Sequence, residues 1–226
     1  YPWLDESKVS VVHNGIDLER WLPVSDDELV RGLGIDPTRP SVVFVGRITR
    51  QKGLPYLLRA AALLPPDVQL VLCAGAPDTP DILAEVQAGV AELQKQRSGV
   101  VWLDRLLSQH ELSAVLTQAT TFVCPSVYEP LGIVNLEAMA CETPVVASRV
   151  GGILETVVDG ETGYLVEPAN PRAIADAINT LLRNPEMAKK FGRNGRRRVE
   201  DHFSWTHIAE KTEALYAEMV EERRRG

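Results

Sequence analysis

Short apolar runs alternate with longer segments of helical period from residue 41 to residue 166. The first run covers residues 41–45 and precedes a helical segment at 53–64. Further strand-like runs lie at 68–73, 100–103, 121–124, 144–147 and 163–166, and further helical segments at 81–96, 109–118, 132–140 and 154–158. The runs do not alternate between apolar and polar residues, which is typical of parallel strands covered by helices on both faces. The pattern therefore predicts an α/β fold built on a doubly wound parallel sheet.

The pattern becomes purely helical after Pro168. The periodicity predicts helices at 171–183 and 185–201, and a last helix over 204–225 that Ser204 caps. The last helix carries one apolar stripe, formed by Trp205, Ile208, Ala209, Thr212, Leu215, Tyr216 and Met219. We therefore expect extra C-terminal helices beside the sheet.

Composition and charge narrow the range of partners. The chain has 226 residues, of which 45% are hydrophobic, and its longest apolar runs fall far short of the roughly 20 residues that span a bilayer. A net charge of −7 argues against a general attraction to nucleic acid or anionic lipid. The opening Tyr1-Pro2-Trp3 has no initiating Met and no secretory-signal layout. We therefore expect a fragment of a longer cytoplasmic protein, with no membrane span and no nucleic-acid partner.

Cysteine and histidine spacing predicts neither a metal site nor a metal cofactor. Cys73, Cys124 and Cys141 form no CxxC pair, and the four histidines show no HExxH spacing. Two of the cysteines lie in strand-like runs, where cysteine usually packs as a small apolar residue. All three are expected to be reduced and structural.

The loop at residues 46–53 follows a buried strand and precedes a helix, a position at which sheets of this kind bind ligands. Gly46 permits close approach of a ligand to the backbone, while Arg47 and Lys52 place two cations at one strand end. Two cations suit a departing nucleoside diphosphate, which develops negative charge. The alternative is that both are ordinary solvated surface residues. The loop matches neither the GxxxxGK[ST] pattern nor GxGxxG, which counts against kinases and NAD enzymes.

A second loop, at residues 125–132, carries two carboxylates into the following helix. Glu129 precedes the helix and Glu137 lies inside it, at a separation that would suit a sugar nucleotide. Leu131 and Gly132 stand at the helix start, where free backbone N–H groups are available to hydroxyls or phosphate. The alternative is that Glu129 is a loop acid that balances the helix dipole and that Glu137 is a routine surface residue.

The third loop, at residues 148–152, ends a strand with Gly151-Gly152. Packing is the default role of such glycines. A role in the site stays open, since this loop should lie beside the second one at the same sheet edge.

Together these motifs resemble the C-terminal domain of GT-B retaining glycosyltransferases of the glycogen synthase type. The resemblance covers residues 9–216 and implies a Rossmann-like fold. It rests on the order and spacing of three groups of residues: Gly46-Arg47 with Lys52 and Gly53; Pro125-Ser126, Glu129-Pro130, Gly132 and Glu137-Ala138; and Pro144-Val145-Val146-Ala147 with Gly151-Gly152.

The resemblance assigns roles to individual residues. Arg47, Lys52 and Glu129 would be catalytic: the two cations bind the donor diphosphate and Glu129 binds hydroxyls of the transferred sugar. Glu137 would bind the ribose, and Leu106 would pack against the base. The remaining nucleotide-sugar contacts would come from the backbone of Gly46, Leu131, Gly132 and Ile133.

A finer similarity, at residues 73–80 and 100–102, is to actinobacterial glycogen synthases. It implies transfer of glucose from ADP-glucose, or from UDP-glucose, to an α-1,4-glucan or a glucose phosphate, with no metal. Other hexosyltransferases such as mannosyltransferases share the general motifs. In the family, an N-terminal domain that this chain lacks supplies the acceptor site, so transfer by the chain alone should be slight.

Three further alternatives stay open. A nucleotide-sugar epimerase would need additional acids and histidines, in which the loops are poor. A non-catalytic nucleotide- or glycan-binding module would bind without turnover. The stripe on the last helix would be partly exposed and could form a homodimer, unless it packs on its own sheet.

Overall fold

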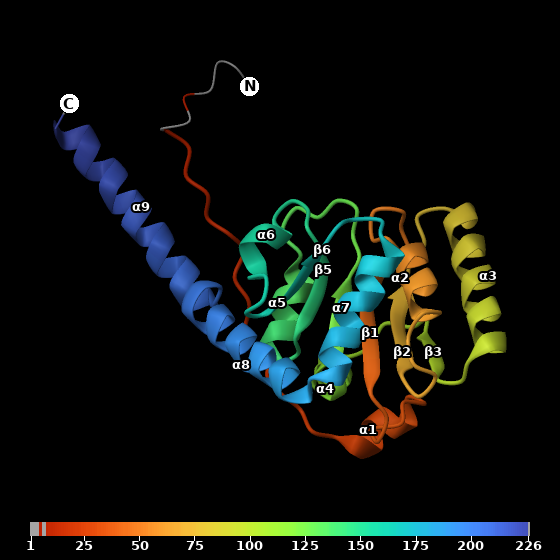
Figure 1. Cartoon of the computed structure of the whole chain (residues 1–226). Helices are drawn as coiled ribbons and strands as arrows, with labels where there is room; N and C mark the ends of the chain where they lie inside the picture. The colour runs from red at the N-terminus through yellow and green to blue at the C-terminus, as the bar shows by residue number, and fades with distance from the viewer. Residues whose placement is uncertain (1–4, 6–7, 226) are drawn as a thin grey trace.

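The computed structural model describes residue 5 and residues 8–225 of the chain. Its centre is a six-stranded parallel sheet with the strand order β3-β2-β1-β4-β5-β6 (Figure 1). The strands are β1 (Ser41–Arg47), β2 (Gln69–Gly75), β3 (Val100–Leu103), β4 (Thr121–Cys124), β5 (Val145–Ser148) and β6 (Gly163–Val166). The chain runs outward from β1 to β3, then returns to β4 on the other side of β1. The carboxyl ends of β1 and β4 therefore flank the switch point, where such sheets bind ligands.

The helices begin where the sequence offers caps or prolines. Thr79 caps α3, Ser108 and Glu111 form a capping box at α4, and Asn170 caps α7 ahead of a proline. The helices are α1 (Asp27–Gly32), α2 (Leu54–Ala61), α3 (Pro80–Gln96), α4 (Gln109–Gln118), α5 (Ile133–Ala140), α6 (Ile153–Thr156), α7 (Pro171–Arg183), α8 (Pro185–His202) and α9 (Trp205–Arg225).

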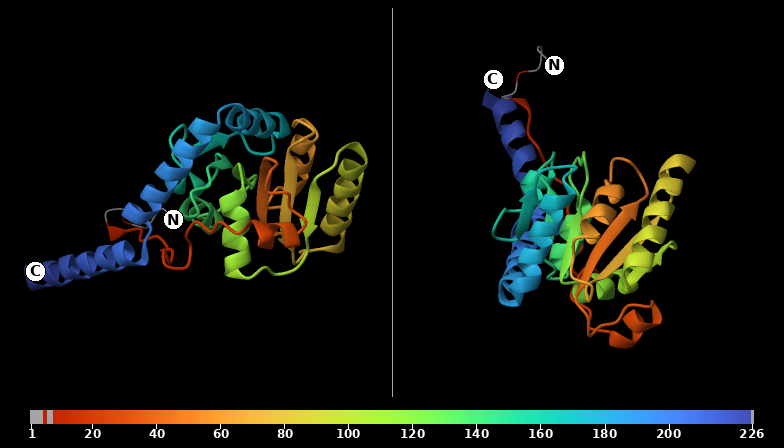
Figure 2. Two further views of the ribbon diagram at one scale, coloured as in Figure 1. Left: turned by 90° about the horizontal axis from the view of Figure 1, so that it is seen from below. Right: turned by 45° about the vertical axis from the view of Figure 1, so that its right-hand side comes forward.

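Successive residues of the central strands point into two separate cores. Val42 and Phe44 of β1 pack with α2, α3 and α7 on one face of the sheet, whereas Val43 packs with α4 and α5 on the other. The two helix layers enclose the sheet in both views of Figure 2. The predicted doubly wound α/β fold is confirmed.

The C-terminal helix α9 extends away from the sheet (Figures 1 and 2). Ile208 near its start is buried, but Trp205, Tyr216 and Met219 are each more than half exposed, at 53%, 63% and 57%. The alternative in which the whole stripe packs on its own sheet is therefore wrong. Beyond its first turns, α9 diverges from the sheet.

Most predicted elements are found with bounds that agree within two or three residues. Helix α1 was not predicted, since its six residues lie in a polar stretch between prolines. The three cysteines are free and buried, as expected. Over the described residues, the structure has no helix with the length and apolarity needed to cross a bilayer.

Candidate functional site

The loops after β1 and β4 are joined by backbone contacts. The Val127 amide donates to the Gln51 carbonyl at 2.9 Å, and the Gln51 side chain donates to the Tyr128 carbonyl at 3.0 Å. Gly53 adopts φ +67°, and a Cβ there would lie 2.0 Å from the Pro125 carbonyl oxygen. A glycine is therefore required where the two loops meet.

Lys52 and Glu129 form an ion pair between these loops. The Lys52 Nζ lies 2.6 Å from the Glu129 Oε2, and the two side chains are 21% and 8% exposed. The Ser126 hydroxyl donates to the same carboxylate oxygen at 3.1 Å. Two partners therefore offset the cost of burying the Glu129 carboxylate. The aliphatic part of Lys52 passes Gly46, where an added Cβ would lie 3.9 Å from the Lys52 Cδ.

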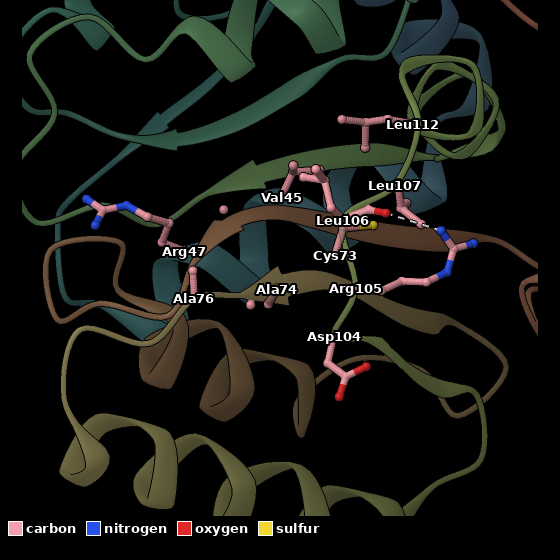
Figure 3. Close-up of a pocket in the computed structure, with 12 residues that line it drawn as sticks. Val45, Arg47, Cys73, Ala74, Ala76, Asp104, Arg105, Leu106, Leu107 and Leu112 are labelled. Atoms are coloured by element: carbon pink, nitrogen blue, oxygen red, sulfur yellow. Dashed lines mark hydrogen bonds between the residues drawn. The ribbon is translucent and has the colours of Figure 1, made fainter.

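Arg47, the second predicted cation, ends β1 at the edge of a pocket of about 310 Å³ (Figure 3). Its Nη1 lies 3.1 Å from the Asp78 Oδ1, and its side chain is 62% exposed. The pocket also contains Gly46 and the 96% exposed side chain of Leu106. Four predicted site residues, Gly46, Arg47, Lys52 and Glu129, thus lie around one strand end, with Leu106 across the pocket.

The pocket wall that carries Leu106 is anchored by Arg105 and Glu111. The Arg105 guanidinium donates through Nη2 at 2.5 Å and Nη1 at 3.2 Å to the two carboxylate oxygens, and the Ser108 amide donates to Glu111 at 2.7 Å. The Arg105 hydrogen bond, followed by those from Ser108, lowers the pKa of Glu111 to about 2. Glu111 therefore stays ionised and holds this loop at the start of α4.

Gly132 is the N-cap of helix α5; it has φ +79° and, as a glycine, offers no side chain to cap the helix. A Cβ at this position would lie 3.3 Å from the Glu129 Cγ, so the helix start adjoins the ion pair. Leu131 is half-buried, and Ile133 is 42% exposed. The first turn of α5 keeps backbone N–H groups that no described side chain caps, as an anion or hydroxyl site requires.

Glu137 lies one turn further along α5, apart from the Lys52–Glu129 pair. Its side chain is half-buried in the described structure. Burial raises the pKa of Glu137 from 4.5 to about 7. The carboxyl is therefore poised near neutral pH to become charged when hydroxyl donors reach it.

The third loop packs directly against the second one, as the sequence predicted. The Gly152 amide donates to the Glu129 carbonyl at 3.0 Å, and a Cβ on Gly152 would lie 2.0 Å from the Pro130 carbonyl oxygen. Gly151 has φ +50°, and a Cβ there would lie 2.2 Å from the Glu129 carbonyl oxygen. The glycine pair therefore has a packing role that fixes the backbone on both sides of Glu129.

The comparison with protein families decides the assignment. The model for "Glycosyl transferases group 1" matches residues 25–198, which is most of the chain and includes all three loops. The chain belongs to the group 1 glycosyl transferases. The predicted enzyme class is thereby confirmed.

Individual relatives of this group 1 glycosyl transferase are substantially longer. The alpha-maltose-1-phosphate synthase of Mycolicibacterium smegmatis is 53% identical over 96% of the chain, which spans 58% of that enzyme. The sucrose-phosphate synthase structure from Thermosynechococcus elongatus is 34% identical, with a TM-score of 0.82 over 98% of this chain and 55% of its own. An Anabaena protein solved in complex with UDP-glucose is 26% identical, with a TM-score of 0.82 over 92% of this chain and 57% of its own.

The names of these relatives support membership of the group 1 glycosyl transferases, but they do not support the finer resemblance to glycogen synthases. The predicted similarity to actinobacterial glycogen synthases is not confirmed, because the actinobacterial relative carries the name alpha-maltose-1-phosphate synthase. Relatives whose names give different products match the same stretch of this chain. The motifs of the group therefore do not distinguish a glycogen synthase from an alpha-maltose-1-phosphate synthase.

The sequence did not single out three residues of this group 1 site. Asp78 pairs with Arg47, and Ser126 donates to Glu129. Asn135 is fully buried in α5, and neither polar atom of its amide has a partner within the described part of the chain. Asp78 carried a usable signal, since it follows β2 at the same sheet edge, and Ser126 lies in the group of residues that carries the resemblance.

Among the described residues, no three His, Cys, Asp or Glu side chains are grouped as a metal would require. Chemistry without a metal stays a prediction. The described cations and carboxylates are the charged groups that this site offers to a ligand.

Proposed function

We propose that this chain is the donor-binding half of a retaining glucosyltransferase that uses ADP-glucose, with UDP-glucose as the alternative donor. The observation that carries the proposal is the position of Lys52. Its aliphatic side chain passes Gly46, and its ammonium lies 2.6 Å from the Glu129 carboxylate, at the strand end that also presents Arg47 to the pocket. This arrangement offers cations for a diphosphate directly beside a carboxylate for sugar hydroxyls.

The chemistry follows from the charges that transfer creates. Cleavage of the bond between sugar and diphosphate leaves negative charge on the departing phosphate, and Arg47 and Lys52 would stabilise it. Glu129 would accept hydrogen bonds from the transferred sugar. Part of the favourable energy of the Lys52–Glu129 pair must then be replaced by contacts with the donor.

The remaining predicted residues would hold the nucleotide. Glu137 would accept the ribose hydroxyls, which would draw its carboxyl into the charged form. Leu106 would cover one face of the base in the pocket. Gly46 would allow close approach of the diphosphate, and the start of α5 would contribute the amides of Leu131, Gly132 and Ile133.

The name of the mycolicibacterial relative favours a glucose phosphate as acceptor. Maltose 1-phosphate contains a second glucose unit joined to a glucose phosphate, so a transferase can form it by adding one glucosyl group to that acceptor. An α-1,4-glucan acceptor and a mannosyl donor remain the alternatives. The acceptor would be bound largely by the part of the longer protein that this chain lacks, and the same part would cover the stripe of α9. Homodimer formation through α9 and a cytoplasmic location stay predictions.

The test uses the full-length protein. Glucose 1-phosphate and glycogen are each supplied with ADP-glucose, UDP-glucose or GDP-mannose, and products are separated and their anomeric configuration is read by NMR. We expect an α-linked disaccharide phosphate from ADP-glucose, with activity at least about 100-fold lower in Arg47→Ala and Lys52→Ala. Arg50→Ala is the control, because Arg50 lies in the same loop but pairs with Glu85.

Two results would overturn the proposal. Inverted configuration in the product would exclude a retaining enzyme. Nucleotide binding with no transfer to either acceptor would favour a non-catalytic module.

A further inference from the structure

Asp78 holds Arg47 by a single contact. The Arg47 Nη1 lies 3.1 Å from the Asp78 Oδ1, and the side chains are 62% and 48% exposed. A guanidinium has five N–H donors, so this contact leaves most of them unused. An exposed ion pair of this kind contributes little to stability, so a stronger ligand can replace it.

The loop that carries Asp78 is firmly placed. The Ile48 amide donates to the Gly75 carbonyl at 2.9 Å, and the Asp78 amide donates to the Ile48 carbonyl at 3.1 Å. Between these bonds, Ala76 adopts φ +46°, a conformation that residues other than glycine rarely adopt. Ala76 also lines the pocket that contains Arg47. Strain of this kind persists where the surroundings hold the backbone in place, so the Asp78 carboxylate has a defined position.

Both cations of the site are therefore neutralised by carboxylates in this structure. Lys52 pairs with Glu129, which has an expected role toward the sugar, whereas no role toward the donor is predicted for Asp78. A diphosphate brings more negative charge than one carboxylate and can accept several N–H bonds from a guanidinium. It can therefore displace Asp78, but it must approach a fixed negative charge to do so.

We propose that Asp78 is a positioning residue for Arg47: it is the counter-ion of the guanidinium, and a donor diphosphate must displace it. This inference rests on the proposed function. Its consequence is that Asp78 weakens the binding of nucleoside diphosphates, which favours release of the nucleotide product after transfer. A residue with a purely structural role would not weaken binding.

The test compares Asp78→Asn with Glu85→Gln, two substitutions that remove the same charge. Glu85→Gln is the matched control because Glu85 is the partner of Arg50, whose Nη1 lies 3.1 Å from the Glu85 Oε2. The Arg50–Glu85 pair is exposed to a similar degree as the Arg47–Asp78 pair. Both variants and the wild-type chain are titrated calorimetrically with whichever of ADP, UDP and GDP the wild type binds most tightly. We expect Asp78→Asn to bind that nucleotide about two- to ten-fold more tightly at low salt, with less than a two-fold change in Glu85→Gln. The gain should shrink in 0.5 M salt, because salt screens exposed pairs.

Other outcomes would overturn the inference. Unchanged or weaker binding by Asp78→Asn would show that Asp78 does not compete with the diphosphate. An equal gain in Glu85→Gln would assign the effect to net charge. The wild-type chain could also bind none of the three nucleotides while all variants remain folded. In that case the assignment of a donor site is wrong, and so is the inference that rests on it.

Discussion

The Lys52 ammonium lies 2.6 Å from the Glu129 carboxylate although 77 residues separate them along the chain. The contact exists because β1 and β4 are neighbours in the sheet and their following loops meet at the carboxyl edge. It joins one residue expected to bind phosphate to another expected to bind sugar, so changes at either one should affect both stability and donor binding.

Removing only the lysine should destabilise the fold. In Lys52→Met the Glu129 carboxylate, only 8% exposed, loses its ammonium partner, and we expect the free energy of unfolding to fall by about 2–4 kcal/mol. The double variant Lys52→Met/Glu129→Gln removes both charges and should regain at least half of that loss. Urea unfolding of the wild-type chain, Lys52→Met, Glu129→Gln and the double variant measures the coupling. If the losses of the two single variants add up to the loss of the double variant, the ion pair contributes no coupling energy.

Glu137 should make stability depend on pH. Its folded pKa of about 7 lies above its ordinary value of 4.5, so the folded state holds the proton more tightly than the unfolded state. The resulting stabilisation is complete below about pH 4.5 and is lost as the pH rises through 7. Glu137→Gln, which mimics the protonated form, should therefore be about 1–3 kcal/mol more stable than the wild type at pH 8.5 and equally stable at pH 4.

Urea unfolding at the two pH values checks this prediction, with Glu210→Gln on the exposed face of α9 as control. An identical difference between Glu137→Gln and the wild type at both pH values would contradict the burial of this carboxyl.

Gly152 should be intolerant of any side chain. Gly152→Ala would place a Cβ 2.0 Å from the Pro130 carbonyl oxygen and 2.8 Å from the Leu131 Cα, both of which are backbone atoms. We expect a loss of at least about 2 kcal/mol in stability and displacement of Glu129. The matched control is Gly32→Ala in helix α1, where an added Cβ meets nothing within 4 Å and should gain about 0.5–1 kcal/mol. Thermal unfolding distinguishes the two, and equal melting temperatures would refute the packing role of Gly152.

Much of the fold was predictable because its elements carry local signals. The four-residue strands β3, β4 and β6 and the helices α4 and α7 have the predicted bounds, since apolar runs, caps and prolines mark their ends. Helix α1 has six residues and only one buried side chain, Val30, so its pattern was too short to recognise. The course of α9 could not be read from its apolar stripe, because periodicity identifies a face but not what covers it.

The site was predictable in its location but not in its pairing. Parallel strands bring their carboxyl ends together, which placed Arg47, Lys52 and Glu129 near one another. Which carboxylate each cation contacts depends on side-chain directions and loop geometry, so the Asp78 and Glu129 ion pairs emerged only from the structure. The burial of Glu137 likewise depends on the helices packed around α5.

The most direct test of the donor site is calorimetric titration of this chain with ADP, UDP and GDP. Wild type is compared with Arg47→Ala and with Arg50→Ala, a loop neighbour whose partner is Glu85 instead of Asp78. We predict that one nucleoside diphosphate binds and that Arg47→Ala weakens this binding at least about ten-fold, while Arg50→Ala changes it less than three-fold. Equal affinity in wild type and Arg47→Ala would contradict the assignment of this strand end to the donor diphosphate.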